Sequence, residues 1–223
     1  MRNARQPGAS ATGVRHFNLR GEFPDPLPAD PLPILTRWLE EAAASVEVDF
    51  NAMVLATATP DGAPSARVVL CKQIEASPPA AVFYTNYASR KGRELEANPR
   101  AAGVFYWPGL GRQARLEGTV VRTTASESDE YFLTRPMLSR IGAIVSRQSQ
   151  PLASRASLAA MVLRTAIRPL AAARRPADWG GYRILLDRIE LWSAGSGRLH
   201  DRVAWVRAAA SDPAAWTPTR LCP

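Results

Sequence analysis

The strongest constraint on the fold is a series of short β-patterned runs, each joined to the next by a tight turn. The first run ends at Pro60-Asp61-Gly62, and the chain returns at once as a second run. Another pair is joined by Gly109-Leu-Gly111. Strands that reverse in this way pair antiparallel. The runs of this kind in the first half of the chain are Asn51–Thr59, Ser65–Ile74, Ala80–Thr85, Ala101–Trp107 and Arg112–Thr123.

Helical patterns are interleaved with these runs. Asp30 is the expected N-cap of a first helix and Pro31 its first residue, with apolar residues at helical spacing to about Val46. Ser89 is expected to cap a short helix that ends before Asn98-Pro99. Further helices are predicted over 126–133, 136–145 and 153–172, and short strands over 182–191, 203–206 and 219–223.

The interleaving of hairpins and helices predicts an α+β fold, an antiparallel β-barrel with helices packed outside. No internal repeat or interior linker divides residues 30–223, so we expect them to form one domain. Residues 1–29 are rich in Pro, Gly and Arg without periodicity, and they predict a flexible N-terminal arm.

Charge and composition narrow the function classes. The net charge is +8, yet the arginines are spread along the chain and form no basic run or zinc-finger spacing, which favours anionic small molecules over nucleic acid. Two cysteines and two histidines predict neither a disulfide framework nor a metal site. No run of 18 apolar residues is present, so no membrane span is expected, and the N-terminus lacks a signal-peptide pattern, which predicts a cytoplasmic protein.

Lysine is rare, and both lysines stand near an arginine at the end of a β-like run. Of 28 basic residues only Lys72 and Lys91 are lysines, in Arg67-Val-Val-Leu-Cys-Lys72 and Ser89-Arg90-Lys91. These clusters are candidate phosphate sites, although a solvated surface is the simpler alternative. Arg67 and Lys72 are five residues apart, so they face opposite sides of a regular strand unless a twist or bulge intervenes.

Two further clusters could bind an anion. Tyr131 and Arg135 are four apart, so on a helix they share one face, with Ser139 following; an ordinary exposed helix is the alternative. On a strand, Arg198, His200 and Arg202 would line one face. A lone histidine is more often structural than catalytic, but one flanked by two arginines also attracts anions.

Beyond these clusters, a set of ordered motifs resembles the pyridoxamine 5′-phosphate oxidase family. The resemblance covers the chain from about Ala29 to Pro223. The motifs are Arg67-Val-Val-Leu-Cys-Lys72, Phe83-Tyr-Thr-Asn86, Ser89-Arg-Lys91, Tyr131-x-x-x-Arg135-Pro136, Ser146-Arg-Gln-Ser149, Trp179-Gly-Gly-Tyr-Arg183, Ile189-Glu-Leu-Trp192 and Arg198-Leu-His-Asp-Arg202.

The resemblance implies an FMN-binding split β-barrel and a homodimer with FMN at the subunit interface. It implies flavin contacts from Arg67, Val68, Val69, Leu70, Lys72, Tyr84, Thr85, Arg90, Lys91, Gln113, Gln148, Ser149, Trp192 and Arg202. It implies substrate contacts from Lys72, Tyr131, Arg135, Ser139, Arg198, Leu199 and His200, with Arg198 and His200 as the catalytic residues over the pyridine ring.

The implied reaction is the oxidation of pyridoxamine or pyridoxine 5′-phosphate to pyridoxal 5′-phosphate, with O2 as acceptor and H2O2 as by-product. Flavin oxidases of phenazine-type biosynthesis are similar but lose the lysine at the position of Lys72, which this chain keeps. A phenazine-type oxidase and a non-catalytic flavin- or pyridoxal-phosphate-binding barrel remain the alternatives. Arg15-His16-Phe17 stands where the family often has an Arg-Glu-Tyr-like run in the arm, so a lid role is doubtful for His16 and Phe17.

Overall fold

A computed structural model describes residues 21–45, 49–167, 174–207 and 215–223. Among them no helix is both long and apolar enough to cross a membrane. The strands are β1 (Ala52–Ala58), β2 (Pro64–Ala76), β3 (Pro79–Asn86), β4 (Arg100–Trp107), β5 (Arg112–Arg122), β6 (Trp179–Ser193), β7 (Asp201–Arg207) and β8 (Trp216–Leu221). The α-helices are α1 (Leu32–Ala44), α2 (Arg90–Ala97), α3 (Ala125–Thr134), α4 (Met137–Val145) and α5 (Arg155–Ala166).

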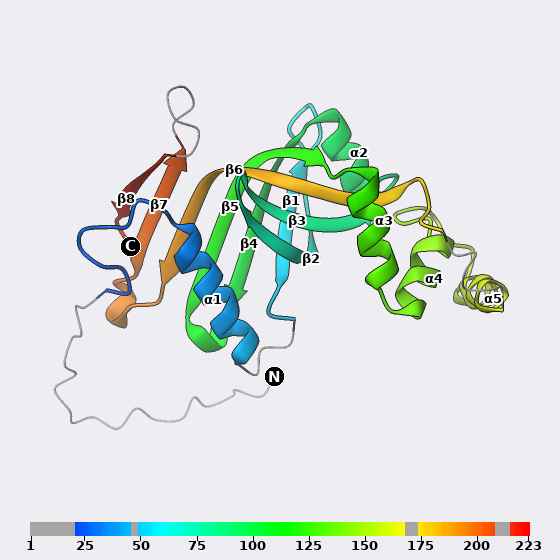
Figure 1. Cartoon of the computed structure of the whole chain (residues 1–223), viewed down its shortest axis with the longest axis horizontal. Coiled ribbons are helices and arrows are strands. Elements are labelled where there is room, and N and C mark those ends of the chain that lie inside the picture. The colour runs from blue at the N-terminus through cyan, green and yellow to red at the C-terminus, as the bar shows by residue number, and fades with distance from the viewer. Residues whose placement is uncertain (1–20, 46–48, 168–173, 208–214) are drawn as a thin grey trace, which may run out of the picture.

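The strands form one antiparallel sheet in the order β3-β2-β1-β4-β5-β6-β7-β8, and β3 also pairs with β6. This additional pairing closes the first six strands into a barrel, which confirms the predicted antiparallel split barrel with α-helices outside. The first half of β6 pairs with β3 and its second half pairs with β7. β6 therefore leaves the barrel at its far end, where β7 and β8 extend the sheet (Figure 1).

The barrel interior follows from alternation along its strands. In β1 and β5 buried side chains alternate with less buried ones, and Met53, Leu55, Ala114 and Leu116 lie inside. α1 covers one side, with Leu35, Trp38 and other apolar residues fully or nearly buried. Its first turn is one residue later than predicted: Pro31 is the N-cap, and the Asp30 carboxylate accepts a hydrogen bond from the Leu32 amide at 2.9 Å.

Part of the predicted flexible arm packs on the domain. Phe23 is buried, its ring centroid 5.8 Å from that of Trp38 and 6.0 Å from that of Trp205. Its amide donates to the Asp201 carboxylate at 3.0 Å, and the Trp205 indole donates to the Pro28 carbonyl at 2.8 Å. The packed chain thus includes residues 21–29 rather than starting at residue 30. Residues 1–20, with Arg15, His16 and Phe17, lie outside the described residues.

α3, α4 and α5 lie at the end of the molecule opposite β7 and β8 (Figure 1). α3 packs against β6, whereas α5 has no buried residue and contacts α4. α5 begins two residues after the predicted Ala153, because Ser154 is its N-cap. The predicted end at residue 172 lies outside the described residues. Arg135 and Pro136 form the corner between α3 and α4.

Candidate active site

A cavity of about 420 Å³, here called the Lys91 pocket, opens between β2, β3, α2 and the α3–α4 corner. Its lining includes many of the residues that sequence analysis singled out. Those are Val68, Val69, Leu70, Lys72, Tyr84, Thr85, Lys91, Tyr131, Arg135, Ser139 and Gln148. Thr134, Pro136 and Trp179 complete the lining.

β2 is irregular at Lys72, which lines the pocket together with Val68 and Leu70. The pairing of β2 with β3 shifts register between Cys71 and Gln73, so Lys72 is the extra residue of a β-bulge. Alternation alone would turn Lys72 away from the side that holds Val69. The bulge does not bring Arg67 into the pocket, so a ligand shared by Arg67 and Lys72 stays a prediction.

Lys91 is buried at the floor of the pocket. Its ammonium donates to the Gln148 amide oxygen at 2.7 Å, to Thr85 Oγ1 at 3.0 Å and to Ser89 Oγ at 3.4 Å. Burial, followed by the nearby charge of Arg67, lowers the pKa of Lys91 to about 8. Gln148 comes from the segment after α4 and is thereby tied to α2. The arrangement concentrates hydrogen-bond donors and positive charge at one wall.

α2 is positioned by its cap and by a close packing contact. Ser89 is the N-cap as predicted, and its hydroxyl accepts from the Gly92 amide at 3.2 Å. A Cβ at Gly92 would lie 2.0 Å from the Tyr87 carbonyl oxygen, so only glycine allows the helix to sit this close to the chain that precedes it. Arg90 and Lys91 therefore start the helix at a fixed place beside β3.

Three aromatic rings that line the pocket stack on one another. The rings of Tyr84 and Tyr131 are 3.8 Å apart, and Trp179 stacks at 5.7 Å from Tyr84. Burial raises the pKa of both tyrosines, so their phenols stay protonated hydrogen-bond donors. Trp179 lines the pocket although sequence analysis did not predict it as a site residue.

Arg135 lies over the Trp179 ring, its guanidinium carbon 4.6 Å from the ring centroid. Its Nη1 atom is buried and has no hydrogen-bond partner among the described residues. Burial lowers the pKa of Arg135. The helical spacing predicted for Tyr131 and Arg135 is wrong, since α3 ends at Thr134 and Arg135 is an extended C-cap. The two side chains and Ser139 nevertheless line the same pocket.

Arg67 and Arg90 do not line the Lys91 pocket but meet beside it at Glu94. Arg90 Nε donates to Glu94 Oε1 at 2.8 Å, and Arg67 Nη2 lies 3.3 Å from Glu94 Oε2. Glu94 is 5% exposed. Ser149 is exposed, next to Gln148, with a φ of 68°.

The remaining predicted residues form a second group, here called the His200 cluster, at the far end of β6. It consists of Gln113, Trp192, Arg198, Leu199, His200 and Arg202. Gln113 of β5, Trp192 of β6 and Arg202 of β7 are direct cross-strand partners. The His200 ring lies 4.6 Å from that of Trp192, and His200 Nδ1 accepts from the Gly195 amide at 3.3 Å. Arg202 donates to the buried Glu190 at 2.8 Å and to the Cys222 carbonyl at 2.9 Å.

The strand predicted for Arg198, His200 and Arg202 is wrong before residue 201. Ser196–Arg198 is a 3-10 turn, and both Gly197 and Arg198 have left-handed backbone conformations. Left-handed residues reverse the chain and break strand alternation. The three side chains therefore share no strand face, and only Arg202 belongs to β7.

The Lys91 pocket and the His200 cluster lie far apart within one chain. Trp179 lines the Lys91 pocket at one end of β6, and Trp192 belongs to the His200 cluster near the other end. Thirteen residues separate them, which is roughly 40 Å along an extended strand. In Figure 1 the α3–α4 corner and β7 lie at opposite ends of the molecule. A single ligand touching both groups needs the His200 cluster of another subunit.

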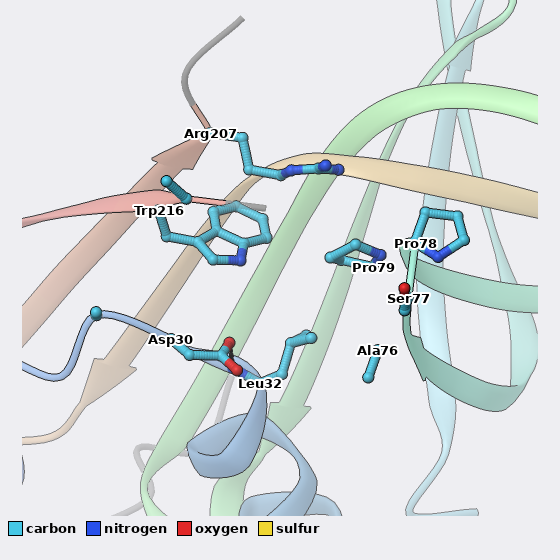
Figure 2. Close-up of a pocket in the computed structure, with 10 residues that line it drawn as sticks. Asp30, Leu32, Ala76, Ser77, Pro78, Pro79, Arg207 and Trp216 are labelled. Atoms are coloured by element: carbon cyan, nitrogen blue, oxygen red, sulfur yellow. Dashed lines mark hydrogen bonds between the residues drawn. The ribbon is translucent and has the colours of Figure 1, made fainter. Parts of the chain in front are cut away.

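A larger hollow of about 670 Å³ lies elsewhere, between the start of α1, the β2–β3 turn and the β7–β8 hairpin (Figure 2). It is lined by Pro78, Pro79 and Trp216, with Asp30 at its edge. The Arg207 guanidinium lies 5.6 Å from the Trp216 ring and donates to the Leu186 carbonyl at 3.1 Å. None of the predicted site residues lines it. Converging polar groups, rather than size, mark the Lys91 pocket as the candidate site.

The chain is also similar to known proteins. Residues 39–167 match the family model described as pyridoxamine 5′-phosphate oxidase. Residues 179–223 match the pyridoxine 5′-phosphate oxidase C-terminal dimerisation region. A pyridoxine/pyridoxamine 5′-phosphate oxidase from Rubrobacter xylanophilus is 47% identical over 213 residues, which is 94% of each chain. The protein of that name from Gluconobacter oxydans is 45% identical over 88% of this chain and 96% of its own.

Solved structures share the fold. PhzG from Burkholderia lata, in complex with tetrahydrophenazine-1-carboxylic acid, has a TM-score of 0.79 and 34% identity over 89% of this chain and 95% of its own. An FMN-binding protein from Nostoc punctiforme has a TM-score of 0.71 at 14% identity, over 88% of this chain and 99% of its own, and shows the fold alone. On the strength of the family-model matches and these identities, the chain belongs to the pyridoxamine 5′-phosphate oxidase family.

Proposed function

We propose that the protein is an FMN-dependent oxidase that converts pyridoxamine or pyridoxine 5′-phosphate to pyridoxal 5′-phosphate, with O2 as acceptor and release of H2O2. The observation that carries this proposal is the buried, unpartnered Nη1 of Arg135 in a pocket that also holds Lys72, Tyr131 and Ser139. A buried donor left without an acceptor costs about 1–3 kcal/mol. A substrate phosphate would supply the acceptor and neutralise the charges of Arg135 and Lys72.

The residues present also suit FMN. Lys91, Thr85 and Gln148 form a connected set of polar groups at the pocket floor, and Arg67 and Arg90 stand beside it. Such a concentration of cations fits the flavin phosphate. We assign Arg67, Arg90 and Lys91 to that phosphate and Lys72 to a place between the flavin and the substrate.

A homodimer is part of the proposal. The match to a dimerisation region supports it, as does the separation of the His200 cluster from the Lys91 pocket. Apolar side chains also stand exposed here: Val68, which lines the pocket, is 62% exposed, and its cross-strand partner Val54 is 43% exposed. A contiguous exposed apolar face favours burial against another chain. We propose that each Lys91 pocket is completed by the partner's copy of this cluster, with FMN between them.

In this reaction FMN, when bound, supplies the two-electron oxidation at the C4′ carbon of the substrate. Arg135, Lys72, Tyr131 and Ser139 hold the phosphate and so fix the distance of that carbon from the flavin. Tyr131 stacks against Tyr84 and Trp179, and these contacts fix the direction of its phenol.

The His200 cluster supplies groups for the pyridine ring. Because His200 Nδ1 accepts the Gly195 amide, a neutral imidazole carries its proton on Nε2 and donates from there. Arg198 adds a positive charge from a left-handed backbone position beside the histidine. We propose that the two residues bind and orient the ring, and that their loss lowers turnover more than flavin retention.

The test is direct. Purified protein should be yellow, and addition of pyridoxine 5′-phosphate should release H2O2 and form pyridoxal 5′-phosphate. A yellow protein that forms neither product from either phosphorylated vitamer would be a flavin-binding barrel without this activity.

The PhzG structure supports a second candidate, an oxidase of reduced phenazine-type rings. Lys72 and Arg135 favour a phosphorylated substrate instead. The relatives named pyridoxine/pyridoxamine 5′-phosphate oxidase are also more similar to this chain in sequence than PhzG is. Assays with tetrahydrophenazine-1-carboxylic acid and pyridoxine 5′-phosphate at equal concentration separate the two. Faster oxidation of the carboxylic acid would favour the second candidate.

A further inference from the structure

Glu94 is a buried carboxylate that the proposed reaction does not use. It lies in α2 with 5% of its side chain exposed. Its Oε2 accepts from Thr57 Oγ1 at 2.5 Å and from Ser65 Oγ at 2.6 Å, and its Oε1 accepts from Arg90 Nε at 2.8 Å. A carboxylate is buried at a high cost unless such partners compensate it. Glu94 has such partners in Thr57, Ser65 and Arg90.

Glu94 is charged at neutral pH. Burial alone would raise the pKa of its carboxyl group, but hydrogen bonds from Ser65, Thr57 and Arg90 outweigh burial and lower the pKa to about 2. The site therefore contains a permanent negative charge among its cations.

The carboxylate joins two arginines that come from different elements. Arg67 extends from β2 and lies 3.3 Å from Oε2, while its Nη1 also donates to Thr57 Oγ1 at 2.5 Å and to the Leu55 carbonyl at 3.3 Å. Arg90 extends from the first residue of α2 and uses only its Nε toward Glu94. Its two Nη groups have no hydrogen-bond partner among the described residues. They form a fork that is free to bind an anion.

The charges of this group match a phosphate monoester. Arg67, Arg90 and Lys91 are positive and Glu94 is negative, so the group carries a net charge of 3 − 1 = +2. A phosphate monoester carries about −1.5 to −2 at pH 7. Without Glu94 the three cations would repel one another, as the effect of Arg67 on the pKa of Lys91 already indicates. Glu94 thus offsets part of the repulsion among the three cations.

We propose that Glu94 is a positioning residue that holds Arg67 and Arg90 for the flavin phosphate and so makes the site prefer a phosphorylated flavin over an unphosphorylated one. The inference rests on the proposed FMN function and deepens it. Glu94 itself touches no ligand in this scheme. Its effect is therefore expected in the ratio of FMN to riboflavin affinity, which a general loss of packing would leave unchanged.

The experiment measures the dissociation constants of FMN and riboflavin by fluorescence quenching, using the full-length protein freed of flavin. In Glu94→Gln, FMN affinity should fall by about 10- to 100-fold, the range typical of a residue that orients a binding group, while riboflavin affinity changes by less than about threefold. Glu96→Gln is the matched control. It removes the same charge from the same helix, but Glu96 is 66% exposed and pairs with Arg122. The ratio of FMN to riboflavin affinity in Glu96→Gln should equal that of the unmodified protein.

Each other outcome is decisive. Equal losses for both flavins in Glu94→Gln would mean a structural role, and tighter FMN binding would mean that Glu94 only opposes the phosphate; either overturns the proposal. Should Glu94→Gln fail to fold, Glu94→Asp can replace it, because it keeps the charge but shortens the side chain. A ratio of FMN to riboflavin affinity in Glu94→Asp equal to that of the unmodified protein would also overturn the proposal. An unmodified protein that binds neither flavin would instead overturn the FMN proposal itself.

Discussion

The Lys91 pocket and the His200 cluster hold their charges in different ways. In the pocket, Lys91 is buried, and Arg135 keeps a buried donor without a partner. In the cluster, Arg202 is paired with the buried Glu190, and the catalytic candidates stand on an irregular, largely exposed turn. The pocket is built to receive an anion, whereas the cluster is built to present side chains outward. In the proposed homodimer, each complete site combines the pocket of one chain with the cluster of the other.

The largest expected effect comes from mixing subunits. Arg135→Ala damages the pocket and His200→Ala damages the cluster, and each homodimer should lose about 100-fold in kcat/KM. A mixed dimer contains one doubly damaged site and one intact site. Random exchange at equal amounts should therefore restore roughly one quarter of normal activity. Activity that stays at the level of the parent variants after verified exchange would mean that both regions serve the site of their own chain.

A second prediction separates phosphate binding from ring chemistry. Arg135→Ala should raise KM for pyridoxine 5′-phosphate by about 100-fold, because it removes charge-assisted hydrogen bonds worth about 1.5–3 kcal/mol. Arg100→Ala is the control, since Arg100 is exposed and pairs with Asp187. Steady-state kinetics with both variants check it. A KM unchanged by Arg135→Ala would show that the substrate phosphate binds elsewhere.

A third prediction uses the titration of Lys91. Its pKa of about 8 means that the ammonium loses its proton as pH rises through 8, and with it one charge that attracts the flavin phosphate. FMN affinity should weaken by about tenfold per pH unit above 8, while riboflavin affinity stays flat. Binding titrations from pH 7 to 9.5 measure this. In Lys91→Met the slope should vanish, and its persistence would assign the titration to another group.

The lowered pKa of Lys91 has the opposite effect on the stability of the flavin-free protein. Since the lowered pKa means that unfolded Lys91 binds more protons between about pH 8 and 10.5, the contribution of this residue to the free energy of unfolding rises across that window. Phosphate affinity and stability therefore change in opposite directions with pH.

The smallest expected effect concerns Trp179. Trp179→Phe keeps the stacked wall but weakens the cation–π contact that supports Arg135, which is worth about 0.5–2 kcal/mol. KM should rise by about three- to tenfold with little change in kcat. Trp192→Phe, in the other region, should leave KM for the substrate phosphate unchanged and loosen FMN instead. Equal effects of the two substitutions on KM would remove the functional distinction between the two regions.

Local signals in the sequence predicted most of the fold and many of the pocket residues. Turn dipeptides and alternation identified the strands, and Ser89 identified the start of α2. The failures have local causes as well. Pro136 disfavours a helical conformation at the preceding residue, which explains why Arg135 ends α3. The left-handed Arg198 could not be read from alternation.

Other features depend on contacts between distant segments, which periodicity does not contain. The bulge at Lys72 is defined by pairing with β3, and the closure of the barrel by pairing between β3 and β6. Glu94 stood inside a predicted helix, but its partners Thr57 and Ser65 are far away in the sequence. The strand was predicted to begin at residue 182, after the two glycines, whereas β6 begins at Trp179.

β6 has a consequence for how the two proposed active sites are connected. It is a single strand with a one-residue register shift opposite Glu117 and Gly118, and it carries Trp179 at one end and Trp192 at the other. In the proposed dimer these ends serve different flavins. β6 would therefore run as one continuous strand from one flavin site to the other.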